Sequence, residues 1–171
     1  MRTSDVLADG FGRVQGIVHR VLDGITADEL AGRVDPQANT VAWLVWHLPR
    51  IQDDHVADVA GVEQGWTAAG WYDRFALPMG GGETGFGHDT DDVGALDGAA
   101  AQLLRSYHDA VHAQTLAFVA TVTDGDLDRV VDTSWDPPVT LGVRLVSVIS
   151  DDLQHAGQAS YVRGVLQRGR P

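Results

Sequence analysis

A short stretch near the C-terminus, "SDDLQHAGQ" at residues 150–158, brings two carboxylates and an imidazole together. Asp151 precedes His155 by four residues and Asp152 precedes it by three, so on a helix both acids lie about one turn from the histidine. A carboxylate and an imidazole on neighbouring turns are common ligands of zinc and other divalent ions. The spacing indicates either part of a metal site, with Asp151 or Asp152 as the acid, or an ordinary Asp–His pair at a helix edge.

A third ligand is available in "NTVAWLVWHLPRIQDDHV", where His47 lies beside the apolar face of a second helical pattern. A lone histidine at such a position is more often a hydrogen-bonded core residue than a ligand. His55 follows eight residues later, about 12 Å further along a helix, which is too far to share one ion with His47. Asp54 and His55 are therefore expected to be surface residues or to belong to a second site.

A rival pair is His108 and His112 in "YHDAVHAQ", which have the same four-residue spacing. Both fall largely off the apolar stripe formed by Leu104, Tyr107 and Val111, and no carboxylate or cysteine clearly shares their face. The pattern favours two solvated histidines over a native metal site.

Four long amphipathic patterns must position these residues, because leucine, valine and isoleucine recur at three- and four-residue spacing. The expected helices span residues 4–25, about 40–60, 90 to about 122, and about 140–168. The expected N-caps are Ser4 or Asp5, Asn39 and Thr140, and Thr90 with Asp91 and Asp92 is expected to open the third helix. No strand alternation or internal repeat is visible, so the sequence predicts an all-α four-helix bundle over a single domain, residues 1–171.

The connection at residues 61–89 contains eight glycines and two tryptophans, and we expect an ordered covering loop there between the second and third helices. Trp66, Trp71, Tyr72 and Phe75 are candidates to line an apolar pocket, and Arg74 is a candidate to meet a substrate carboxylate. The same aromatic residues are equally suited to plugging an open end of the bundle.

The composition excludes several classes of function. The net charge is −12, with 12 basic residues, all arginine, against 24 acids, so a nucleic-acid or anionic-membrane partner is not expected. No apolar run is long enough to span a membrane, and the N-terminus does not read as a signal peptide, so the expected location is the cytoplasm. The absence of cysteine means that the chain supplies no thiol nucleophile of its own. HExxH, GxSxG and GxxxxGK[ST] motifs are also absent.

Four segments together resemble the DinB-like superfamily across nearly the whole chain: "VAWLVWHLPRIQDDHV", "GWYDRF", "TGFGHDTDDV" and "DDLQHAGQASYVRG". Within it, the sequence is most similar to the branch near mycothiol-dependent maleylpyruvate isomerase and related thiol transferases. The resemblance implies an up-down-down-up four-helix bundle that holds a divalent metal, zinc or nickel most often.

The resemblance also implies three metal ligands, which fall on His47, Asp151 and His155 in this chain. Members with three histidine ligands carry histidine where Asp151 stands, and the isomerase-like branch carries glutamate, so an acid is tolerated. Aspartate is one methylene shorter, which keeps Asp152 as the alternative acid. Gln158 is a candidate for a contact behind the ligands or with a loop.

By the same resemblance, the activity would be that of a transferase or isomerase. A low-molecular-weight thiol such as mycothiol or bacillithiol would bind the metal as a thiolate and attack an electrophilic small molecule. A homodimer is also implied. Two alternatives stay open: a metal-assisted hydrolase that uses bound water, and a non-enzymatic binding or interaction module on the same bundle.

Overall fold

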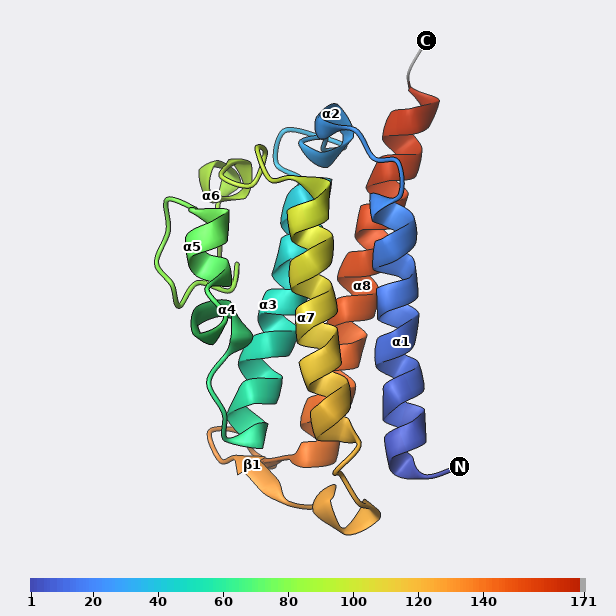
Figure 1. The fold of residues 1–171 in the computed structure, drawn as a ribbon, viewed down its shortest axis with the longest axis vertical. Coiled ribbons are helices and arrows are strands. Elements are labelled where there is room, and N and C mark those ends of the chain that lie inside the picture. The colour runs from blue at the N-terminus through green and yellow to red at the C-terminus, as the bar shows by residue number, and fades with distance from the viewer. Residues whose placement is uncertain (170–171) are drawn as a thin grey trace.

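The computed structural model describes residues 1–169 and is dominated by four long helices (Figure 1). These helices are α1 (Thr3–Leu22), α3 (Val41–Ala60), α7 (Ala101–Val119) and α8 (Leu141–Arg168). The chain runs up in α1, down in α3, down again in α7 and up in α8. The predicted up-down-down-up bundle, with a long connection between its second and third long helices, is therefore confirmed.

Each long helix packs against two others, α1 and α3 both lying against α7 and α8. The antiparallel pairs are α3 with α8 and α1 with α7. One buried cluster, which includes Val14, Trp46 and Leu104, fills one part of the interior. A second, which includes Phe11 and Leu145, fills another. This packing brings residues near position 47 next to residues near position 155.

The predicted third helix over residues 90–122 is wrong in extent. The structure has a short helix α6 (Thr90–Gly94), then a non-helical stretch, and α7 only from Ala101 to Val119. Gly94 and Gly98 interrupt the pattern, and each glycine costs a helix interior about 1 kcal/mol relative to alanine. The prediction of one continuous helix was based on apolar spacing, which does not include this cost of glycine.

Helix starts differ from expectation at α1 and α3. Thr140 caps α8 as predicted, its side chain accepting from the backbone N–H of Val143. Thr40 rather than Asn39 caps α3, whereas α6 begins at Thr90 as expected, with Asp89 as its N-cap. α1 begins at Thr3, ahead of the predicted caps, and ends at Leu22 before Gly24, whose φ is +62°. An additional short helix, α2 (Ala27–Leu30), follows it.

The connection between α7 and α8 contains a 3₁₀ turn (Asp124–Asp126) and a two-stranded antiparallel sheet, formed by β1 (Val130–Asp132) and β2 (Val139–Thr140). The expectation of no strands is thus wrong in this detail. Strands of three and two residues are too short to leave an alternating pattern in a sequence. No helix within residues 1–169 is long and apolar enough to cross a membrane.

Residues 61–89, here called the covering segment, pack beside α3 (Figure 1). The segment contains α4 (Gly65–Ala68) and α5 (Trp71–Phe75). The Asp53 carboxylate accepts hydrogen bonds from the backbone N–H groups of Gly65 and Trp66, at 2.9 and 2.7 Å. Arg50 Nε donates to the carbonyl of Glu83 at 3.0 Å. Two buried side chains of α3 therefore fasten both ends of the covering segment.

Candidate metal centre

Three side chains from α3 and α8, here called the α3–α8 cluster, meet between the two helices: His47, Asp151 and His155. One potential ligand atom of each residue lies within 4.8 Å of those of the other two. His155 Nε2 is 3.7 Å from Asp151 Oδ1, and the His47 and His155 rings are 4.7 Å apart, edge to face. The antiparallel packing of α3 on α8 thus brings together residues more than 100 positions apart in the sequence.

His47 is held in one orientation by the covering segment. Its Nδ1 lies 2.5 Å from the backbone carbonyl of Thr84, which can only accept, so Nδ1 carries the proton. The lone pair then resides on Nε2. Trp43 stacks on the ring at 4.5 Å and 15°. Burial lowers the pKa of His47, which favours the neutral imidazole that a metal requires.

His155 is oriented in the same way from the other side. Its Nδ1 lies 2.9 Å from Gln158 Oε1, an acceptor, so the proton is again on Nδ1 and Nε2 is left with its lone pair. Nε2 is the atom that faces Asp151. A hydrogen bond from the far nitrogen is the usual companion of a metal-bound histidine, because it fixes both tautomer and ring orientation.

Asp151, rather than Asp152, belongs to the cluster. Asp151 is half-buried, and its solvent-shielded Oδ2 has no hydrogen-bond partner within residues 1–169. Asp152 is fully buried on the core side of α8, neither of its oxygens has a partner in the same part of the chain, and burial raises its pKa well above the usual value. Asp152 and Ala156 lie on the buried face of α8, and Asp151 and His155 lie at its edge.

This donor set fits a divalent cation. Two imidazole nitrogens with free lone pairs and a carboxylate with one orphaned oxygen converge from two rigid helices. Zinc and nickel accept this mixture of nitrogen and oxygen ligands, and three protein ligands leave a position for a further molecule. The geometry is that of an open site rather than a closed structural one.

Several residues that support the cluster were not identified from the sequence. Trp43 stacks on His47 and donates from Nε1 to His88 Nδ1 at 3.1 Å. His88 in turn stacks against Trp46 at 5.9 Å. The "TGFGHD" stretch holds Thr84 and His88, so the motif carried a signal. A backbone carbonyl as the partner of His47 has no signature in a sequence.

Gly85 is required where the covering segment passes His47. Its φ is +100°, a conformation that side chains disfavour. A Cβ there would lie 2.6 Å from His47 Nδ1 and 2.9 Å from the Trp43 ring. Glycine at this position therefore lets the Thr84 carbonyl reach the histidine.

The other candidate site residues, Trp71, Arg74 and Gln158, lie in different surroundings. Gln158 is joined to the cluster through its bond to His155. Trp71 is buried against Tyr107, with ring centroids 5.6 Å apart. Arg74 lies over the Trp71 ring at 4.4 Å and donates to the carbonyl of Ala69. The contacts of Trp71 and Arg74 are those of packing within the covering segment, and their substrate role stays a prediction.

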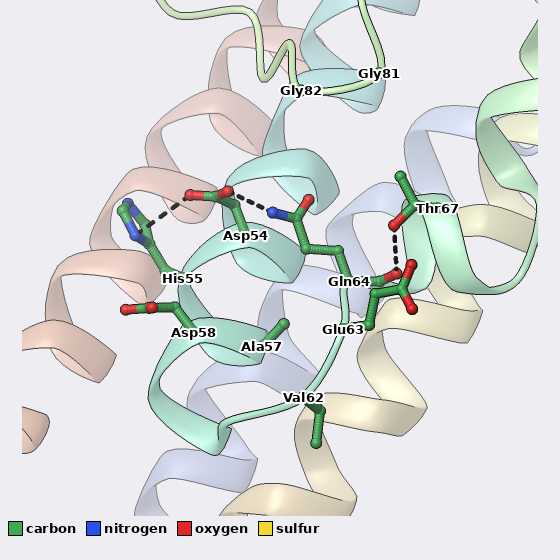
Figure 2. A pocket seen from close by; sticks show the side chains of 10 residues that line it. All are labelled: Asp54, His55, Ala57, Asp58, Val62, Glu63, Gln64, Thr67, Gly81 and Gly82. Carbon is green, nitrogen blue, oxygen red and sulfur yellow. Dashed lines mark hydrogen bonds and ion pairs between the residues drawn. The ribbon is translucent and has the colours of Figure 1, made fainter.

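A pocket of about 520 Å³ lies between α3 and the covering segment (Figure 2). Three carboxylates line it, those of Asp54, Asp58 and Glu63, together with His55. Burial and the neighbouring Arg144 lower the pKa of His55. Asp54 and His55, predicted as surface or second-site residues, thus line a polar cavity that disfavours anions.

The expectation that His108 and His112 are solvated is wrong. His108 is fully buried and His112 nearly so, and His108 lies against His19 of α1. His108 lies with Asp109 and with His19 of α1 in a second group of potential ligands, whose atoms are also within 4.8 Å of one another. The sequence pattern indicated no carboxylate on the face of His108 and His112, but in the structure Asp109 lies beside His108.

Comparisons with known proteins agree with this fold. The sequence model of a family described as Mycothiol-S-transferase matches residues 7–168. A solved structure, "Crystal structure of the conserved protein of locus from Enterococcus faecalis", is 29% identical, with a TM-score of 0.89. The similarity covers 95% of this chain and 96% of that one. No curated protein matches the chain. The match over residues 7–168 confirms the resemblance to DinB-like proteins, and the chain belongs to the mycothiol-S-transferase family.

Proposed function

We propose that this protein is a divalent-metal-dependent transferase that joins the sulfur of a mycothiol-type thiol to an electrophilic small molecule. The observation that carries the proposal is the convergence of His47, Asp151 and His155 with both histidine Nε2 atoms left free. The family match supports the class of thiol.

The α3–α8 cluster would hold the ion, and its donor set suits zinc or nickel. A bound divalent ion would supply the Lewis acidity that keeps a thiol deprotonated at neutral pH. The chain has no cysteine, so the sulfur must come from a cosubstrate. An isomerase that uses the thiol as a transient nucleophile would need the same arrangement.

The residues of the chain orient and shield this centre. The Thr84 carbonyl and Gln158 Oε1 fix the tautomers of the two histidines before any ligand arrives. Trp43, buried against His47, excludes water from one side of the cluster. Such preorganisation means that little rearrangement opposes binding.

The acidic pocket between α3 and the covering segment is our candidate site for the carrier part of the thiol cosubstrate. Asp58 and Glu63 are exposed at its wall and can accept hydrogen bonds from hydroxyl groups. Three carboxylates disfavour an anionic ligand at this position. Arg74, outside this pocket, is proposed as a contact for a carboxylate on the electrophile.

The test is conjugate formation by metal-loaded protein, with mycothiol and a panel of electrophiles, followed by mass spectrometry of the products. We expect thiol-dependent S-conjugates. His47→Ala should lower the rate by about 10³-fold, because a metal Lewis acid contributes several kcal/mol and each ~1.4 kcal/mol is tenfold.

Gln154→Ala is the matched control, since Gln154 is an exposed neighbour of His155 on α8 that bonds to Ser150. It should retain the rate. If the protein converts the electrophiles at an equal rate without any thiol, the metal-assisted hydrolase replaces this proposal. Absence of conjugates across the panel with metal-loaded protein would refute it.

A further inference from the structure

We propose that this chain carries a second divalent-cation site, formed by His19 of α1 with His108 and Asp109 of α7, which takes zinc or a similar borderline metal ion. These three residues are called the α1–α7 cluster. One ligand atom of each lies within 4.8 Å of those of the others. The site is separate from the α3–α8 cluster and shares no residue with it.

The distances describe a group that is nearly assembled. His19 Nε2 is 2.6 Å from Asp109 Oδ1, and His108 Nδ1 is 3.9 Å from the same oxygen. The second separation is too long for a hydrogen bond. Donors that bind one tetrahedral ion at 2.0–2.1 Å lie about 3.3 Å apart. The two separations would therefore change by roughly 0.7 Å each, in opposite directions, on taking an ion.

The observation that points to a ligand is His108. Its ring is fully buried, and neither Nδ1 nor Nε2 has a hydrogen-bond partner within the described residues. A buried polar atom without a partner costs about 1–3 kcal/mol, so native structures retain few of them. A cation on Nδ1, the nitrogen that faces Asp109, would satisfy one of the two atoms.

An ion can reach the α1–α7 cluster from solvent, and the residues of the cluster make few other contacts that compete with it. The side chains of His19 and Asp109 are 36% and 39% exposed, which gives an ion a path to the buried histidine. Gln15 donates to Asp109 Oδ1 at 2.9 Å and can shift without breaking a helix. Arg105 donates to the backbone carbonyl of His19, so one positive charge lies nearby. The net charge of −12 favours cations overall.

The experiment is a Zn²⁺ titration of metal-stripped full-length protein in competition with a chromogenic chelator. We expect two ions per chain for the wild type and one for His19→Ala, with affinity at the altered site reduced at least about 100-fold. Asp109→Asn should give the same result. His19 and Asp109 are half-exposed, so both variants should fold, and far-UV circular dichroism checks this. Asp9→Asn, on the exposed face of α1, is the matched control and should retain two ions.

His47→Ala separates this proposal from the proposed function. It should bind one ion, and the double variant with His19→Ala should bind none. An ion lost in His19→Ala but retained in His47→Ala supports the second site even if the α3–α8 cluster binds nothing. If His19→Ala and Asp109→Asn bind as many ions as the wild type, with unchanged affinity, the second site does not exist.

Discussion

The two clusters contain the same donors, two histidines and one aspartate, yet the chain surrounds them differently. In the α3–α8 cluster each histidine has a hydrogen bond that fixes its far nitrogen, to Thr84 or to Gln158. In the α1–α7 cluster the buried His108 has no such bond on either nitrogen from any residue that the structure describes. Residue types alone therefore do not distinguish a preorganised site from a loosely assembled one.

The difference has an identifiable cause in the fold. The covering segment lies over α3 and brings a backbone carbonyl to His47, whereas α1 and α7 pair without an overlying loop. Outer partners of metal-binding histidines typically contribute 10- to 100-fold in affinity. We therefore expect the α3–α8 cluster to bind zinc at least about tenfold more tightly than the α1–α7 cluster.

The largest expected effect comes from breaking the attachment of the covering segment. Arg50 is fully buried, 3.8 Å from Asp53, and bonds to Glu83 and Gln64. Arg50→Met should destabilise the protein by about 3–5 kcal/mol, because it leaves the buried Asp53 charge without its partner. Urea denaturation measures this. Arg13→Met, at an exposed ion pair, should change stability little, and equal losses in both variants would contradict the role of Arg50.

Gly85→Ala tests the contact between the covering segment and His47 directly. The added Cβ would meet His47 Nδ1 at 2.6 Å and must displace the Thr84 carbonyl or the ring. Zinc affinity at the α3–α8 cluster should fall about 100-fold, with the α1–α7 cluster unchanged. Gly82→Ala, in the same segment with open space around its Cβ, is the control for competition titrations. Matching affinities in the two variants would show that the carbonyl contact is dispensable.

A smaller effect is expected at the other histidine. Gln158→Ala removes the acceptor for His155 Nδ1, and because Gln158 is exposed, water can partly replace it. Zinc affinity at the α3–α8 cluster should fall about tenfold. Gln154→Ala, four residues before it, should leave the affinity unaltered. The orienting role assigned to Gln158 would be wrong if both variants bind zinc like the wild type.

The smallest effect on zinc affinity is expected from Gln15, which lies next to the α1–α7 cluster. Gln15 donates to Asp109 Oδ1 and is the outer partner of that cluster. Gln15→Ala should change zinc affinity there by less than about tenfold, since the lost bond is that of one half-exposed side chain. Gln102→Ala on α7 is the control, and calorimetry of the His47→Ala background isolates the site. A loss above 100-fold would mean that Gln15 itself is a ligand.

Much of the fold could be predicted because apolar spacing determines which helix faces are buried. The long helices α1, α3 and α8 lie close to their expected bounds, and Thr140 was recognised as a cap from its type. The break between α6 and α7 was missed, because two glycines weaken a helix without changing its apolar spacing.

The site was predictable only in part. The i,i+4 spacing of Asp151 and His155 follows from helix geometry, whereas the pairing with His47 came from a family resemblance. The burial of His108 and the approach of Thr84 depend on which neighbouring element faces each residue. Such facts arise from tertiary packing, which a single helical pattern does not contain.

Metal binding by the α3–α8 cluster can be observed by anomalous diffraction at the zinc edge, from crystals of the full chain grown with Zn²⁺. We expect a peak between α3 and α8, about 2.0–2.2 Å from the Nε2 atoms of His47 and His155 and from an Asp151 oxygen. Absence of a peak there at saturating zinc, or ligation through either Nδ1, would contradict this expectation.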